Sequence, residues 1–142
     1  MSNVIMREDA GGTSEGILRK VLTEKHTVAA AGTSTTTIQV PAGAVVASCT
    51  CYVSTAVTNA ASFDIGDGTD VDRFGATIAV AAATGTTRAS WTAPVGDTPI
   101  GSYSRAAAHN IVFTANGGNF TGGVIHVVVI YELPDALDHN LA

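Results

Sequence analysis

The chain contains a series of short segments in which apolar and polar residues alternate. Between residues 47 and 54, Ala, Cys or Val occupies every second position, with Ser, Thr or Tyr between them. Successive side chains of a β-strand point to opposite faces, so this alternation predicts a strand with one buried face. Turn-forming residues, mostly Gly, Pro, Asn and Asp, separate the segments. The pattern predicts eight strands, at 35–40, 44–57, 62–65, 74–81, 86–91, 99–103, 109–115 and 123–132.

Residue usage also favours strands over helices. Leu and Met are absent between residues 23 and 132, and Lys and Glu are absent between residues 26 and 131. These unbranched side chains are good helix formers, whereas the Val, Ile and Thr that replace them favour the pleated surface of a sheet. We therefore expect an all-β protein. Eight short strands separated by turns indicate a two-sheet β-sandwich with a jelly-roll-like topology.

The last predicted strand differs from the others because both of its faces are apolar. One face carries Val124, His126, Val128 and Ile130, and the other carries Ile125, Val127, Val129 and Tyr131. An antiparallel sheet normally has one solvated, polar face. The second face should therefore be covered by the N-terminal segment or by a neighbouring subunit, or alternatively by the chain's own loops. We expect the first set of four residues to form a subunit interface.

The ends of the chain differ in character from its middle. Residues 1–25 hold four basic and four acidic residues and are expected to form an N-terminal arm, either extended or containing a short helix or strand. Ile17, Leu18, Val21 and Leu22 have helical spacing after Ser14, yet residues 20–28 also alternate as a strand would. The expected sandwich covers residues 26–133, and residues 134–142 form a C-terminal tail.

Composition excludes several classes of function. Only 13% of the 142 residues are charged, against about 25% in typical soluble domains, and the net charge is −5. There is no basic cluster to neutralise phosphates, so we expect no nucleic-acid partner. No apolar run approaches the roughly 20 residues of a membrane span, and the N-terminus lacks the apolar stretch of a secretory signal. So little charge favours a surface that other molecules cover.

Two groups of residues could bind a metal, and for both we favour a structural role. Cys49 and Cys51 are one residue apart and have no spaced partner, so we interpret them as core side chains. Four carboxylates between Asp64 and Asp72 could bind calcium, but their spacing does not match an EF-hand loop. Asp and Gly are also the residues that turns require. We expect a turn here, and no metal or cofactor.

Catalytic motifs are missing from the sequence. The histidines are His26, His109, His126 and His139, and no Gly-x-Ser-x-Gly motif accompanies them. We expect no enzymatic activity, since an enzyme such as a glycan esterase would need a buried Ser–His–carboxylate arrangement. A further alternative, a secreted calcium-binding adhesin, would use the Asp64–Asp72 segment.

Three segments, 36–46, 63–74 and 123–131, resemble small structural proteins of tailed bacteriophages. They are similar to jelly-roll decoration, or cement, proteins, which bind the outer capsid as trimers. The resemblance implies a protein that stabilises the shell without catalysis. It implies a homotrimer bound to the major capsid protein, located on the outer surface of the virion and made in the host cytoplasm.

On this interpretation two sets of residues make the contacts. The arm would contact the capsid through Val4, Ile5, Arg7, Ile17, Leu18 and Arg19. The last strand would contact other subunits through Val124, His126, Val128 and Ile130. The alternative is a receptor- or glycan-binding module of a tail fibre, which would have a binding pocket beside Trp91 or Tyr103.

Overall fold

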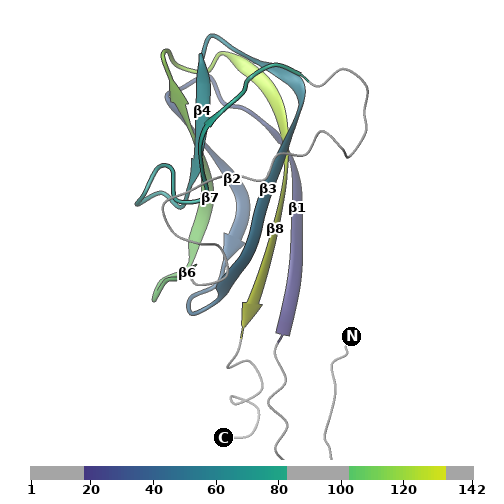
Figure 1. The fold of residues 1–142 in the computed structure, drawn as a ribbon, viewed down its shortest axis with the longest axis vertical. Helices are drawn as coiled ribbons and strands as arrows, with labels where there is room; N and C mark the ends of the chain where they lie inside the picture. Colours follow the sequence, from purple (N-terminus) through teal and green to yellow (C-terminus); the bar gives the residue numbers. More distant parts are fainter. Residues whose placement is uncertain (1–17, 83–102, 134–142) are drawn as a thin grey trace, which may run out of the picture.

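The computed structural model describes residues 18–82 and 103–133 (Figure 1). This part of the chain is all β and contains no helix. Its strands are β1 (Leu18–Thr27), β2 (Thr33–Val40), β3 (Val45–Thr58), β4 (Ser62–Gly66), β5 (Gly75–Ile78), β6 (Tyr103–Ser104), β7 (His109–Asn116) and β8 (Gly122–Leu133). β4, β7 and β8 begin and end within one residue of their predicted ranges. The predicted strand at 86–91 lies outside the described residues.

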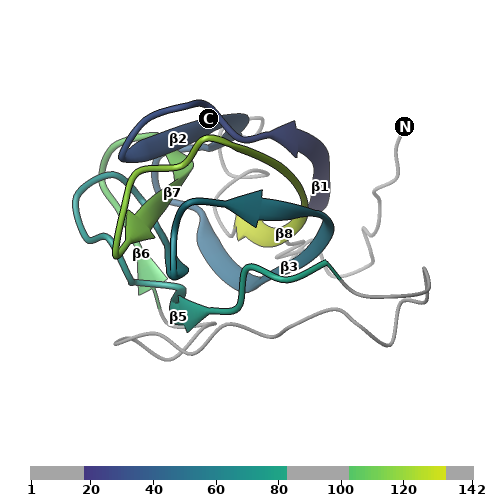
Figure 2. The same ribbon diagram turned by 90° about the horizontal axis from the view of Figure 1, so that it is seen from above.

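The strands form two four-stranded antiparallel sheets that pack face to face. The strand order is β1-β8-β3-β6 in the first sheet and β2-β7-β4-β5 in the second. Every hydrogen-bonded pair is antiparallel. Figure 2 views this sandwich from above, with β1, β8 and β3 on one side and β2 and β7 on the other. β1 pairs with β8 and β2 pairs with β7, so each sheet brings together strands from opposite ends of the chain. The predicted all-β, two-sheet sandwich is confirmed, whereas residues 1–17 of the predicted arm lie outside the described residues.

The core lies between the two sheets and is built on four buried phenylalanines, Phe63, Phe74, Phe113 and Phe120. The rings of Phe63 and Phe113 meet edge to face, with centroids 5.7 Å apart and planes at 88°. That geometry suits the quadrupoles of two aromatic rings. These residues come from β4 and β7, which are neighbours in the second sheet. Both side chains are completely buried, so they lie on the face of the second sheet that packs against the first sheet.

The predicted alternation is confirmed from Cys49 to Val53 of β3, but it fails at Ala47, because an irregularity between Val46 and Ser48 places Val46 in the core instead. Cys49, Cys51 and Val53 are buried, while the residues between them are partly buried on the opposite face. Both cysteines are free thiols. Burial raises the pKa of both, that of Cys51 to about 12. They are therefore core side chains and not reactive thiolates.

The N-terminal boundary of the sandwich differs from the predicted one. Residues 18–27 form β1, which pairs with β8 from Leu18↔Leu133 to Thr27↔Val124. The strand alternative is thus the one that the structure adopts. A helix in this segment would leave one edge of β8 without backbone partners over ten residues. The sandwich begins at Leu18 rather than at residue 26, and residues 1–17 and 134–142 lie outside the described part.

Replacing a core phenylalanine should destabilise the fold much more than replacing its neighbour on the same strand. Phe113 is completely buried, so Phe113→Ala should lower the free energy of unfolding by about 3–5 kcal/mol. Thr114→Ala, on the partly buried outer side of β7, is the control and should cost less than about 1 kcal/mol. Urea unfolding measures both. Equal losses would contradict the assignment of the two faces of β7.

Candidate functional site

β8 divides its apolar residues between the two faces of the first sheet, as the sequence predicts. Ile125, Val127, Val129 and Tyr131 are buried on the inner face. Val124, His126, Val128 and Ile130 are only partly buried on the opposite face. This second set, together with the residues beside it on β1 and β3, is called here the β8 outer face. β8 lies in the middle of the first sheet, between β1 and β3 (Figure 1).

The centre of the β8 outer face carries no charged side chain. Ile130 lies between Val21 of β1 and Ser48 of β3. In the next row, Val128 lies between Thr23 and Thr50. Val21, on the edge strand β1, is 58% exposed beside Ile130. These rows form an uncharged strip in which the apolar Val21, Val128 and Ile130 lie beside the hydroxyl-bearing Ser48, Thr23 and Thr50.

Polar groups border this strip at both ends. Toward one end, Arg19 of β1 and Glu132 of β8 form an exposed ion pair with 3.3 Å between Nη1 and Oε2. Toward the other, His126 lies between Lys25 and Tyr52. The His126 and Tyr52 rings are 6.0 Å apart in an edge-on arrangement. An apolar centre with a polar border is the usual composition of a protein–protein interface.

The second sheet shows the ordinary pattern on its outer face. Thr33, Thr35 and Gln39 of β2 are exposed there, and their neighbours in sequence are buried. On β7, Asn110, Val112 and Thr114 occupy the corresponding partly buried positions, so this face carries one valine among polar side chains. The apolar β8 outer face is therefore a property of the first sheet and not of the whole sandwich.

The remaining predicted contact residues are placed only in part. Leu18 begins β1 and is 37% exposed, and Arg19 is exposed beside it. Val4, Ile5, Arg7 and Ile17 lie outside the described residues. Trp91 also lies outside them, and of Tyr103 only the backbone of β6 is described. The alternative of a glycan pocket beside these aromatics is thus a prediction that the structure leaves untested.

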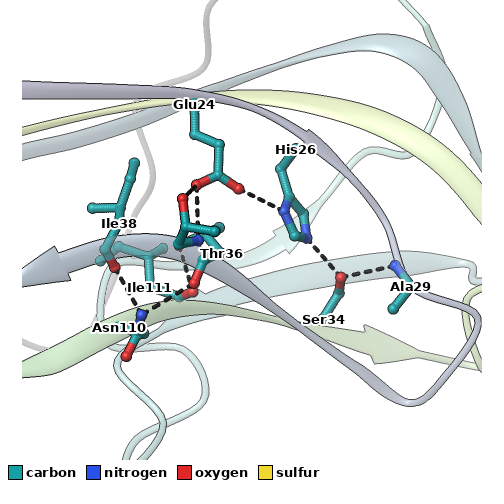
Figure 3. A network of polar contacts seen from close by, with 9 residues as sticks. Glu24, His26, Ala29, Ser34, Thr36, Ile38, Asn110 and Ile111 are labelled. Carbon is teal, nitrogen blue, oxygen red and sulfur yellow. Dashed lines mark hydrogen bonds and ion pairs between the residues drawn. The ribbon is translucent and has the colours of Figure 1, made fainter.

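A polar cluster that the sequence did not reveal joins the first strands of the two sheets (Figure 3). The carboxylate of Glu24 on β1 accepts from His26 Nδ1 at 2.8 Å, and His26 Nε2 lies 2.7 Å from Ser34 Oγ on β2. The second Glu24 oxygen accepts from the backbone N–H of Thr37 at 2.8 Å and from its hydroxyl. We call Glu24, His26, Ser34 and Thr37 the β1–β2 cluster.

A β-bulge in β2 positions Thr37 for this contact. The register between β2 and β7 shifts between Thr35 and Gln39. The Asn110 side chain fills the gap by donating to the carbonyls of Thr36 and Ile38 at 3.1 and 3.2 Å. The extra residues of a bulge lack ladder partners. The N–H of Thr37 therefore finds its acceptor in Glu24 instead.

The β1–β2 cluster has the connectivity of a Ser–His–carboxylate triad, but its surroundings suit a structural role. Ser34 is 2% exposed, and its Oγ also accepts the N–H of Ala29 at 2.8 Å. A nucleophilic serine must reach a substrate carbonyl. Burial raises the pKa of Glu24, but hydrogen bonds from Thr37 and His26 outweigh it and hold that pKa below its ordinary value. The carboxylate is thus kept ionised as an acceptor between two strands.

Asp64 lies in β4, and the residues from Asp67 to Asp72 form a turn held by internal contacts. Oδ1 of the buried Asp67 accepts the N–H groups of Thr69 and Asp70, both at 2.9 Å. Its Oδ2 pairs with Arg73 at 3.2 Å and with Arg105 at 3.6 Å. Both oxygens are therefore already engaged. In the part of the chain that the structure describes, no three His, Cys, Asp or Glu side chains are arranged to hold a metal ion.

This turn fastens the β4–β5 connection to the segment after β6. Arg105 follows β6 and also donates to the Asp67 carbonyl at 3.1 Å. A side chain at Gly66 could not fit, because its Cβ would lie 1.9 Å from the Asp70 carbonyl. His109 is buried nearby, and burial lowers its pKa although a hydrogen bond to the backbone of Ala107 and the charge of Asp67 act in the opposite direction. We call Asp67, Arg73 and Arg105 the Asp67 cluster.

Removing the charge of Asp67 should destabilise the sandwich. Asp67→Asn keeps an acceptor for the turn but removes the buried counter-charge of Arg105, while Arg73 keeps its ion pair with the partly exposed Asp70 at 3.2 Å. The free energy of unfolding should fall by about 2–4 kcal/mol. Glu132→Gln, which breaks an exposed ion pair, is the control and should cost less than about 1 kcal/mol. Thermal unfolding with and without calcium completes the test: a clear stabilisation by calcium would contradict the turn interpretation.

The comparisons with known proteins bear on the fold. No protein-family model matched the chain, and no curated protein matched it. Among solved structures, the chain is similar to one from a structure titled "Cyanophage Pam1 capsid asymmetric unit". The two chains have 24% sequence identity and a TM-score of 0.60, over 91% of this chain and 94% of the other. At this identity the likeness shows a shared fold, and a shared fold alone does not fix a function.

No helix in the described residues is long and apolar enough to span a membrane.

Proposed function

We propose that this protein is a structural component of a tailed-bacteriophage virion, a decoration protein that binds the outer capsid as a homotrimer and stabilises the shell. The observation that carries the proposal is the likeness to a chain of a cyanophage capsid asymmetric unit, which extends over almost the full length of both chains. The resemblance of segments 36–46, 63–74 and 123–131 to phage decoration proteins supports it independently.

The β8 outer face is the proposed subunit interface. Val124, Val128 and Ile130 are apolar and only partly buried within one chain, and Val21 beside them is 58% exposed. Burying an aliphatic side chain completely is worth about 1.5–3 kcal/mol, so covering several of them favours association. The centre of the face carries no charge that would have to be desolvated. Closed cyclic assemblies repeat such a contact around one axis.

The N-terminal arm is the proposed capsid contact. Leu18 and Arg19 are exposed at the start of β1, where the arm joins the sandwich. Val4, Ile5, Arg7 and Ile17 precede them in the sequence and supply apolar and basic side chains. The proposed partner is the major capsid protein, and the proposed location is the outer surface of the virion after synthesis in the host cytoplasm.

The proposal includes no catalysis. Its support is the burial of Ser34 and the use of its Oγ by His26 and Ala29 within the fold. The carboxylate of Glu24 is likewise engaged by Thr37 as well as by His26. Every polar atom of this arrangement thus has a partner that holds β1 against β2.

A charge in the centre of the β8 outer face should prevent trimer formation. The wild-type chain should have a solution mass of three times 14.3 kDa by light scattering. Val128→Lys should reduce it to that of one chain, because a buried lysine charge without a partner costs several kcal/mol. Val112→Lys, a partly buried position on the outer face of the second sheet, is the matched control and should leave a trimer. A trimer in both variants would exclude this face as the interface.

Removing the arm should abolish capsid binding without dissociating the trimer. A chain lacking residues 1–17 keeps all of β1, so it should fold and retain the wild-type solution mass. Its co-sedimentation with capsids that lack this protein should fall at least tenfold compared with the full chain. Unchanged co-sedimentation would show that the arm is not the capsid contact.

A further inference from the structure

The two sheets have no backbone ladder between them where β1 meets β2. β1 is the edge strand of the first sheet and β2 the edge strand of the second. Ladder hydrogen bonds run only within a sheet, so side chains must tie these two edges together. The β1–β2 cluster does so: Glu24 and His26 point from β1 toward β2, with side chains only 15% and 11% exposed (Figure 3).

With His26 neutral, the following arrangement of protons gives every polar group of the cluster a partner. Thr37 donates its backbone N–H and its hydroxyl to Glu24, and neutral His26 donates from Nδ1 to the same carboxylate. Ser34 then donates its hydroxyl to His26 Nε2 and accepts the N–H of Ala29. Glu24 is therefore surrounded by donors alone. Protonation of Glu24 would remove the charge that strengthens these three bonds, and it would turn one carboxylate oxygen into a donor, so that Thr37 Oγ1 or His26 Nδ1 would have to change from donor to acceptor.

We propose that the β1–β2 cluster is an acid-sensitive latch, in which protonation of Glu24 releases β1 from the edge of β2. The inference concerns a single chain and does not depend on the proposed function. β1 also supplies Val21 and Thr23 to the β8 outer face. Release of β1 would therefore loosen that face as well.

His26 is the titratable group that faces Glu24 in the described part of the chain. On β2 the facing groups are the hydroxyls of Ser34 and Thr37. From β7 the Phe113 ring packs on His26, with centroids 5.6 Å apart. On β8 the residues opposite Glu24 and His26 are Val127 and Ile125, which carry no charge. Lys25, between them on β1, is exposed.

Protonation of His26 alone does not break the hydrogen bonds of the β1–β2 cluster. The imidazolium keeps its Nδ1–H donor to Glu24 and adds charge attraction, and its Nε2–H donates to Ser34 Oγ. Glu24 is the group that breaks the cluster. Its pKa in the folded chain lies below the ordinary 4.5, so its stabilising effect is complete above that value and is lost as the pH falls through the lower folded value.

Hydrogen exchange of the β1 amides as a function of pH tests the latch. Exchange rates of Leu18–Thr27 are compared with those of β3 and corrected for the intrinsic effect of pH. In the wild type, protection of β1 relative to β3 should fall about tenfold or more as the pH drops below 4.5 and passes through the lower folded-state pKa of Glu24. Glu24→Gln should already show the lower protection at neutral pH, with no such fall, because the amide offers only one acceptor oxygen. A parallel pH dependence in wild type and Glu24→Gln would overturn the proposal.

Two further variants complete the test, one as a control and one that removes a single donor to Glu24. Glu132→Gln, another Glu on the first sheet that pairs with a strand neighbour, is the matched control and should behave as the wild type. Thr37→Val keeps the carboxylate but removes one donor to it. It should raise the pH at which half of the β1 protection is lost, toward the ordinary pKa of glutamate. An unchanged midpoint in Thr37→Val would also overturn the latch, even if Glu24→Gln failed to fold.

Discussion

The structure depends on a central strand, β8, that is apolar on both faces. Its inner side chains pack in the core against the second sheet, and burial of that apolar surface is the main force holding the sandwich together. Its outer side chains have the same chemistry but are only partly buried by β1 and β3. Part of the apolar surface of β8 therefore stays accessible to solvent within one chain. Burying that surface against another molecule would be favourable.

Two polar clusters complement the apolar core by closing the open sides of the sandwich. The β1–β2 cluster joins the edge strands on one side. The Asp67 cluster fastens the β4–β5 connection to the segment after β6, near the other pair of edges. In each cluster one carboxylate accepts from several donors, which gives strong, directional bonds where no ladder can form. The sheets are therefore held together by apolar packing in the middle and by charge-assisted hydrogen bonds at the sides.

Much of this fold was predictable because its signals are local. The alternation around Cys49, the turn chemistry of the Asp67 segment and the two apolar faces of β8 each depend on neighbouring residues only. β1 was harder to predict, because its sequence fits a helix and a strand almost equally. Its conformation is decided by pairing with β8, about a hundred residues later in the chain. Tertiary contacts commonly override weak local preferences in this way.

The polar clusters could not be predicted, since their partners meet only through the fold. Glu24 was assigned to a charged arm, and nothing in the sequence links it to Ser34 or Thr37. The single local signal is that Leu22, Glu24 and His26 share one face of an alternating segment, so two polar side chains face inward. An inward-facing polar residue must find a partner, but the sequence does not say which one.

Chemical access to the β8 outer face tests most directly whether another molecule covers it. The natural thiols of Cys49 and Cys51 are buried, so a Val128→Cys variant reports on this face against a low background. Its reaction with a small thiol reagent should be slow at high protein concentration and should speed up at least tenfold on dilution. A Val112→Cys variant on the second sheet should react at a constant rate. If the thiol of Val128→Cys reacts quickly at every concentration, the β8 outer face is not covered by association.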